Sequence, residues 1–207
     1  MWREKLTGIS WSGGAWGSGD LEANDASPEE ILLWMTWTQL KDDPFLIDLF
    51  TPAGASEPER IEVTEFRNLV EFANLPRLQI YLASTTEEQR PTKLDVTEIR
   101  VLIGLRFDLA HAMERVTPPG TGTFSGVLRR VKNALKANHQ MTTLVNGTQT
   151  PLAPGGSNQE GAVSYLVDID EEGGRHTLTA ELEWVYKTNI DFDTGRISNI
   201  VRAGGYA

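Results

Sequence analysis

The chain has 207 residues, of which 40% are hydrophobic and 23% are charged, so it can bury one sizeable core. A formal net charge of −10 argues against wrapping of nucleic acid, and the absence of cysteine excludes disulfides, a thiol nucleophile and cysteine-ligated zinc. No window approaches the roughly 18 apolar residues that span a bilayer, so we expect a soluble protein with no membrane partner.

Residues 1–26 are rich in glycine, serine and tryptophan, and we expect them to form a flexible, extended N-terminal arm. Trp11 and Trp16 lie between glycines and serines, which offer them nothing local to pack against. Tryptophans on such an arm can anchor it in pockets of a partner, where they dominate the binding energy. The alternative, an arm folded back on its own domain, stays open.

A helix is predicted from Ser27, because Ser27 as N-cap, Pro28 and Glu30 form a capping box with the favoured proline. This helix should end before Pro44. Residues 45–58 begin apolar and are expected to end as a loop. Residues 60–73 mix strand and helix signals and are left unassigned.

The second half of the chain alternates apolar and polar residues over 77–83 and 96–110, which predicts two strands. Gly104 in the second strand indicates a bulge or bend. An amphipathic helix of about residues 124–138 follows, and then a long polar loop over 146–160. Two final strands should be joined by a hairpin at residues 171–174.

One wet and one buried face in the last strand predict an antiparallel sheet with helices on one side. We therefore expect an α+β fold with a mainly antiparallel four-stranded sheet and helices packed on one face. The domain should span residues 27–190, between the arm and a C-terminal tail of residues 191–207.

The segment RVTPPGTGTFSG, residues 115–126, contains the PPGTG run with which many ATPases bind phosphate. In the frame G-x-x-x-x-G-K-[ST], Gly122 fits, but Thr117 replaces the first glycine and Thr123 the lysine. Phe124 stands where the Mg²⁺-binding hydroxyl should be. Because a threonine cannot supply the positive charge of the lysine, we expect a turn from strand to helix. A small nucleotide-binding enzyme remains the alternative from another class.

Two acidic motifs have structural explanations that we prefer to catalytic ones. Asp170, Glu171 and Glu172 crowd at the predicted hairpin and, with Asp168, suggest a hard cation, but an exposed hairpin tip explains them better. The Asp-Thr-Gly at Asp193 occurs once, whereas an aspartic protease needs two such carboxylates. The three histidines are scattered. We expect no enzyme, no catalytic or metal residue and no cofactor.

A basic helix face is the remaining polar feature, with four cations in eight residues of an acidic chain. This face is either simply solvated, or it contacts an acidic partner or passing DNA. Its residues are Arg129, Arg130, Lys132 and Lys136.

Four segments in succession resemble the tail terminator, or tail completion, proteins of long-tailed bacteriophages. They are LPRLQIYLA, VTEIRVLIGLRFDLA, GVLRRVKNALKAN and GAVSYLVDIDEEGGRHTLTAELEWVYKT. The likeness covers about residues 28–188, and the arm, the loop at 146–160 and the segment after Thr188 depart from it. The matching residues are Leu75, Pro76, Leu78, Ile80 and Tyr81 at its start, with Glu183 and Tyr186 near its end.

This resemblance implies a structural virion protein that forms a ring, usually a hexamer, on the head-proximal end of the finished tail tube. The ring would stop tube growth and present a surface for head joining. Its partners would be copies of itself, the tail tube protein and a neck or head-connector protein, with DNA passing through the lumen without sequence-specific binding. It would lie at the tail–neck junction of the virion after assembly in the host cytoplasm. A neck or head-completion protein between portal and tail is the alternative.

Overall fold

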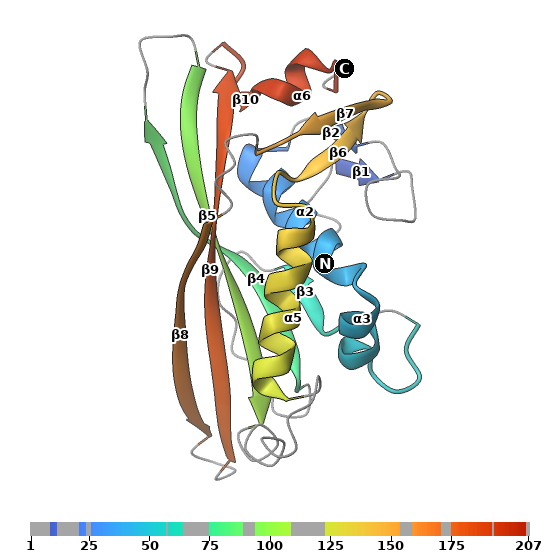
Figure 1. Cartoon of the computed structure of the whole chain (residues 1–207), viewed down its shortest axis with the longest axis vertical. Coiled ribbons are helices and arrows are strands. Elements are labelled where there is room, and N and C mark those ends of the chain that lie inside the picture. The colour runs from blue at the N-terminus through green and yellow to red at the C-terminus, as the bar shows by residue number, and fades with distance from the viewer. Residues whose placement is uncertain are drawn as a thin grey trace.

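The molecule is an α+β fold in which helices cover one face of a mixed sheet of six strands (Figure 1). It is a computed structural model of the chain. The residues that it describes are 9–11, 21–23, 26–56, 58–63, 75–88, 94–108, 123–153, 159–170, 175–191 and 193–205.

The sheet has the neighbour order β10-β9-β5-β4-β3, and β8 also pairs with β9. All pairs are antiparallel except β3 with β4, which is parallel. The predicted four-stranded antiparallel sheet is therefore its centre, and β3 and β10 extend it because short strands give too little alternation to read. The strands are β3 (Ile61–Val63), β4 (Arg77–Glu88), β5 (Leu94–Asp108), β8 (Gln159–Asp170), β9 (Arg175–Asp191) and β10 (Arg196–Ile197).

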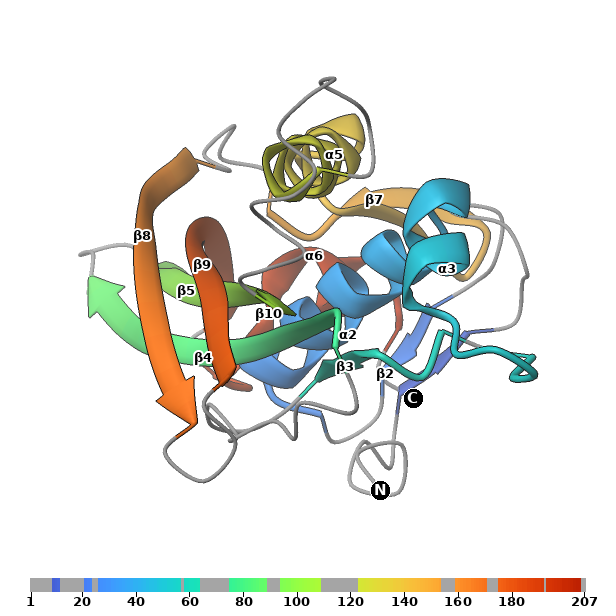
Figure 2. The ribbon, with the colours of Figure 1, turned by 90° about the horizontal axis from the view of Figure 1, so that it is seen from below.

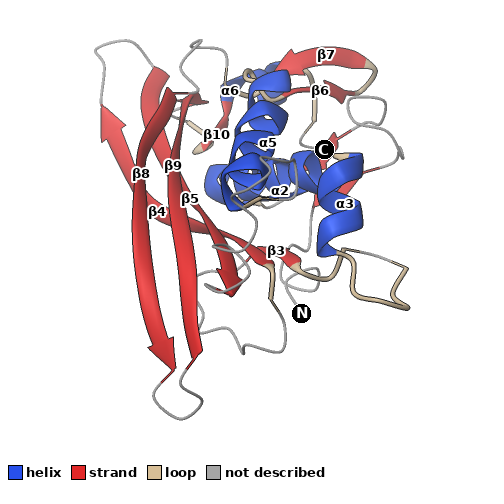
Figure 3. Ribbon diagram, turned by 60° about the horizontal axis from the view of Figure 1, so that its bottom comes forward, coloured by secondary structure: helices blue, strands red, loops and turns tan. Residues whose placement is uncertain are grey.

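The helices lie together on one side of this sheet (Figures 2 and 3), as predicted. Helix α5 packs against both α2 and α3. Gln39 of α2 fixes one of these contacts, because its amide nitrogen donates to the carbonyl oxygen of Ala134 in α5 at 2.6 Å. The helices are α2 (Pro28–Lys41), α3 (Pro44–Phe50), α5 (Phe124–Ala137) and α6 (Ser198–Arg202).

Helix α2 begins with the predicted capping box, since Ser27 Oγ accepts from the backbone N–H of Glu30 at 3.2 Å and the Glu30 carboxylate accepts from that of Ser27. Helix α3 was not predicted, because its seven residues show no periodicity. Its signal is local: Pro44 is its first residue, and Asp43 Oδ1 accepts from the backbone N–H groups of Phe45 and Leu46.

The core lies between the helices and the sheet and is centred on β9. The buried face predicted for this strand comprises Leu178, Ala180, Leu182, Trp184 and Tyr186. The last four are fully buried, and Leu178 is half-buried. The opposite face is less wet than expected, because Gln79 and Thr179 there are also buried. Burial of Trp184 and Leu182 alone removes enough apolar surface to contribute several kcal/mol.

A short hairpin of β6 (Thr142–Val145) and β7 (Thr148–Pro151) occupies the start of the predicted polar loop. Its turn is Asn146-Gly147, and both residues have positive φ, 48° and 73°, as a two-residue hairpin turn requires. The dipeptide Asn-Gly was therefore a readable signal that the prediction of a loop missed.

Parts of both ends of the chain form secondary structure that the sequence did not predict. In the arm, β1 (Ile9–Trp11) pairs with β2 (Leu21–Ala23), and β2 lies against β6. In the expected C-terminal tail, β10 pairs with β9, and Ile197 and Ile200 are buried in the core. The alternating pattern that predicts strands was too short to show in these segments.

The bulge expected at Gly104 lies elsewhere. Gly104 keeps regular pairs with both neighbouring strands, and the ring of Tyr81 lies over it at 3.6 Å from where a Cβ would stand. The irregularity is on β4, between Leu82 and Ser84. A second one is on β8 at Gly161, where a Cβ would meet that of Glu183 at 2.9 Å, so this strand position excludes a side chain.

Candidate interaction surfaces

The basic helix face of α5 is largely neutralised within the chain. Arg130 Nε lies 2.8 Å from Asp43 Oδ2, and Lys132 and Lys136 lie 2.5 and 2.8 Å from the two oxygens of Glu160 on β8. Arg129 is exposed, and the structure shows no ion pair for it among the described residues. Three of the four cations thus hold α5 to α3 and β8, which leaves little free charge for an acidic partner.

Glu160 forms the electrostatic contact between β8 and α5. Hydrogen bonds from Lys132 and then Lys136 lower the pKa of the Glu160 carboxyl below its usual range, against a smaller opposing effect of burial. The Glu160 carboxylate thus ties the start of β8 to the helix layer.

The acidic hairpin and the arm lie only partly within the described residues. Asp170 ends β8 opposite Arg175, which confirms the predicted pairing of these strands, while Glu171 and Glu172 lie outside the described residues. Trp11 pairs with Leu21 in the β1–β2 ladder, and Trp16 lies outside the described residues. Partner contacts at these positions remain predictions.

The PPGTG run also lies outside the described residues, but the helix after it is clear. Thr123, the residue in the position of the lysine, is the N-cap of α5, and its Oγ1 accepts from the backbone N–H of Gly126 at 3.0 Å. This hydroxyl is therefore used in capping. Phe124 next to it is buried in the core, where it contacts the ring of Phe107 edge-on.

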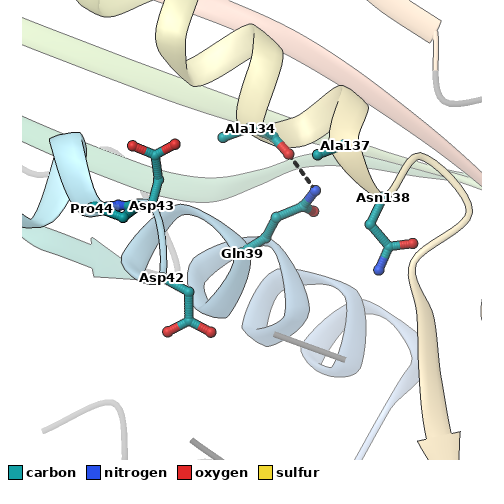
Figure 4. A pocket seen from close by; sticks show the side chains of 7 residues that line it. All are labelled: Gln39, Asp42, Asp43, Pro44, Ala134, Ala137 and Asn138. Atoms are coloured by element: carbon teal, nitrogen blue, oxygen red, sulfur yellow. Dashed lines mark hydrogen bonds between the residues drawn. The ribbon is translucent and has the colours of Figure 1, made fainter. Parts of the chain in front are cut away.

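A cavity of about 340 Å³ lies where α2 and α5 end and α3 begins (Figure 4). Gln39 lies deepest, and its Oε1 has no hydrogen-bond partner there. Burial raises the pKa of Asp42 at its mouth, and Asp43 is taken up by Arg130 and the cap of α3. The lining of the cavity is Gln39, Asp42, Asp43, Pro44, Ala134, Ala137 and Asn138.

The residues that carry the resemblance lie on both faces of the sheet. On the face away from the helices, Tyr81 donates to Glu181 at 2.7 Å, and Glu183 accepts from Arg100 at 2.6 Å. On the helix side, the hydroxyl of the buried Tyr186 lies 2.8 Å from Thr36 Oγ1 of α2. These side chains join β9 to β5 and, across β5, to β4, and they fix the sheet to α2, so their observed roles are structural.

Among the described residues, the most exposed large apolar side chains are on β8, and the sequence analysis did not single them out. Tyr165 is 61% and Val167 56% exposed, both on the helix-facing side of the sheet. The ring of Phe124 lies near Tyr165, with 6.4 Å between the ring centroids. The free edge of β8 has no partner strand among the described residues. The signal available was the run AVSYLV, which alternates poorly because neither face is fully covered.

Within the described part of the chain, no set of three acidic or histidine side chains is placed to hold a metal ion. No described helix is long and apolar enough to cross a bilayer. No protein-family model matches the chain, and no curated protein matches it significantly. The surfaces above are therefore the basis for assigning a role.

Proposed function

We propose that the chain is a structural virion protein that forms a ring on the head-proximal end of a phage tail tube. The ring ends tube growth and supplies the surface for head joining. It acts through assembly geometry and not through catalysis. Its place is the tail–neck junction of the virion, after assembly in the host cytoplasm.

One observation carries the proposal: the four segments that resemble tail terminators form one continuous unit. They supply β4, β5, α5 and the β8–β9 hairpin, in which β4, β5 and β9 are adjacent strands and Glu160 of β8 is paired with Lys132 and Lys136 of α5. A unit of this kind, with an open strand edge on one side, suits repeated head-to-tail contacts that close by rotation.

The charge of the molecule is consistent with this role. At −10, the chain is acidic, and the described basic side chains of α5 are mostly paired internally. A ring of such subunits would bind DNA weakly, because affinity for duplex DNA comes largely from cations that neutralise phosphates. DNA could then pass through the lumen without being retained.

Native mass spectrometry of the purified protein, alone and with purified tail tubes, tests the proposal. We expect a closed oligomer, six copies by the resemblance, either free or formed only on tube ends, and tubes that stop growing when the protein is present. Tubes assembled without the protein are the control. A monomer that ignores tubes would contradict the proposal. A ring that ignores tubes but binds a portal or connector would identify the neck protein, and binding of labelled ATP the enzyme.

A further inference from the structure

The edge strand β8 carries a surface that the isolated chain leaves open. Strand β9 uses one edge for β5 over residues 177–191 and the other for β8 over 175–185. Strand β8 therefore presents its second edge outward, and no described strand pairs with it. Figure 1 shows β8 at the margin of the sheet, with the helices α2 and α3 on the other side of the molecule.

This edge lacks the features that usually protect an exposed strand. Residues 162–167, AVSYLV, contain neither a charge nor a proline, and four of the six are exposed. Uncharged segments of this length with high strand propensity pair readily with other chains. At the other end of the sheet, β3 has only three residues, and the indole N–H of Trp37 donates to the carbonyl oxygen of Ile61 at 3.0 Å.

A second open edge lies on β4. Strand β3 pairs with residues 78–80 of β4, and no described strand pairs with the same edge of β4 from Leu82 to Glu88. Ala83, Ser84 and Thr86 are exposed along it. Among the described residues, β8 and the second half of β4 therefore each present a long edge without a partner strand.

The strand directions make these two edges complementary. Strand β8 is antiparallel to β9, β9 to β5, and β5 to β4, so β8 and β4 run in opposite directions. A copy rotated about an axis roughly along the strands would bring its β4 beside β8 in an antiparallel pair, and the next copy would repeat the contact. Pairing of β8 with itself would also be antiparallel, but it would close as a dimer and leave β4 open.

We propose that residues 162–167 of β8 pair with residues 83–88 of β4 in a second copy of this chain, and that this backbone pairing is the contact that repeats around the ring. The two edge segments are offset along the strand direction, since that of β8 lies beside residues 178–183 of β9 and that of β4 lies level with residues 185–189. Such an offset is what tilted strands need when a sheet closes. The pairing rests on the proposed function for its cyclic form.

The same contact would cover the exposed apolar side chains. Thr85 faces the helix side of the sheet, and its Oγ1 donates to Glu29 Oε1 of α2 at 3.1 Å. The start of α2 in the second copy would thus lie beside Tyr165 and Val167. Their burial would add hydrophobic stabilisation to the backbone hydrogen bonds.

Because the chain has no cysteine, cross-linking by single introduced cysteines can test the pairing. Ser164 and Thr86 are exposed and lie on the outer face of their strands, opposite Glu181 and Glu98. Ser164→Cys and Thr86→Cys proteins, one with a size tag, are mixed and mildly oxidised, with Ser84→Cys as a second register. Asn133→Cys, an exposed position on α5, is the matched control.

We expect a covalent dimer that contains one protein of each kind, and none with the control. Covalent dimers of Ser164→Cys alone would overturn the proposal in favour of two-fold pairing of β8. A ring by native mass without the mixed dimer would overturn the pairing and leave the proposed function standing, whereas a monomer by mass would count against the function as well.

A charge on the edge gives a second measurement that does not depend on register. Val167→Lys should reduce the fraction of protein in the ring at least about tenfold, the change that about 1.4 kcal/mol per contact produces. Gln149→Lys places the same charge on an exposed position of β7 and should leave the ring unchanged. Equal ring fractions for the two variants would overturn the assignment of β8.

Discussion

The helix-facing sides of the neighbouring strands β9 and β8 differ sharply in burial. On β9, Ala180 and Leu182 are fully buried. On β8, Tyr165, which is the partner of Ala180 in the ladder, is 61% exposed, and Val167 is 56% exposed. The two strands are consecutive in the chain and pair with each other, and these side chains lie on the same face of the sheet. What separates them is the cover from the helices: Thr36 of α2 hydrogen-bonds to Tyr186 of β9, whereas Tyr165 of β8 is 61% exposed beside Phe124 at the start of α5.

This contrast shows what alternation along a strand reports. It identifies the side to which a residue points, but the layer above decides whether that residue is buried. An apolar residue that points to the covered side of a sheet yet lies beyond the helices is exposed in the single chain. Such a strip marks a contact with another chain more often than a packing defect.

Truncation of aromatic side chains on the two strands should give the largest difference. Trp184→Ala on β9 should lower the free energy of unfolding by about 3–5 kcal/mol, because it opens a cavity in the packed core. Tyr165→Ala on β8 should change it by less than about 0.5 kcal/mol, because the side chain is 61% exposed. Urea unfolding of the monomer at equal protein concentration measures both.

The comparison would fail if the two truncations destabilised the monomer equally. Trp184→Phe keeps most of the ring volume, so it serves if the alanine variant is too unstable to purify. Tyr165→Ala should instead lower the fraction of protein in the ring, which would show that its burial comes from assembly.

Sequence reasoning found the parts of the fold that have long periodic patterns or a strong cap. The capping box at Ser27, the amphipathic α5 and the β8–β9 hairpin were all predicted, and the helices do cover one face. It missed β3 and β10, which have three and two residues, since a strand of that length shows no alternation. The hairpin at Asn146-Gly147 was readable but lay inside a segment judged only by its polarity.

The candidate surfaces were harder to predict, because they depend on which residues meet. The four cations of α5 are adjacent in sequence, but nothing in the sequence places Glu160 or Asp43 beside them. The edge of β8 shows the converse: its residues were assigned to a strand, but its position at the margin follows from the strand order. Both outcomes depend on long-range pairing, which local patterns do not encode.

Removal of a hydroxyl group should give a smaller difference in stability between Tyr186 on β9 and Tyr165 on β8. Tyr186→Phe removes a buried hydroxyl that hydrogen-bonds to Thr36, and it should cost about 0.5–1.5 kcal/mol of unfolding free energy. Tyr165→Phe is the matched control on β8 and should change the free energy of unfolding by close to nothing.

Burial also raises the pKa of Tyr186 well above its ordinary value, so its ionisation should be absent from an alkaline absorbance titration until the protein unfolds. Ionisation of Tyr186 in the folded protein would contradict this assignment.

The smallest expected effect concerns the ion pairs that attach β8 to the helix layer. Glu160→Gln should lower the unfolding free energy by about 0.2–1 kcal/mol at neutral pH, since both lysine contacts are partly exposed. The pKa of Glu160 is lower in the folded chain than in the unfolded one, so its contribution is present above the ordinary glutamate pKa of about 4.3 and is lost as the pH falls below it. Urea unfolding from pH 7 to pH 3 should therefore show that the unfolding free energies of the wild type and the variant converge in acid.

The same carboxylate bonds to both Lys132 and Lys136, so Lys132→Met in the Glu160→Gln background should add little further loss of unfolding free energy. An additive loss in the double variant would mean that Lys132 stabilises the fold through contacts other than the one with Glu160.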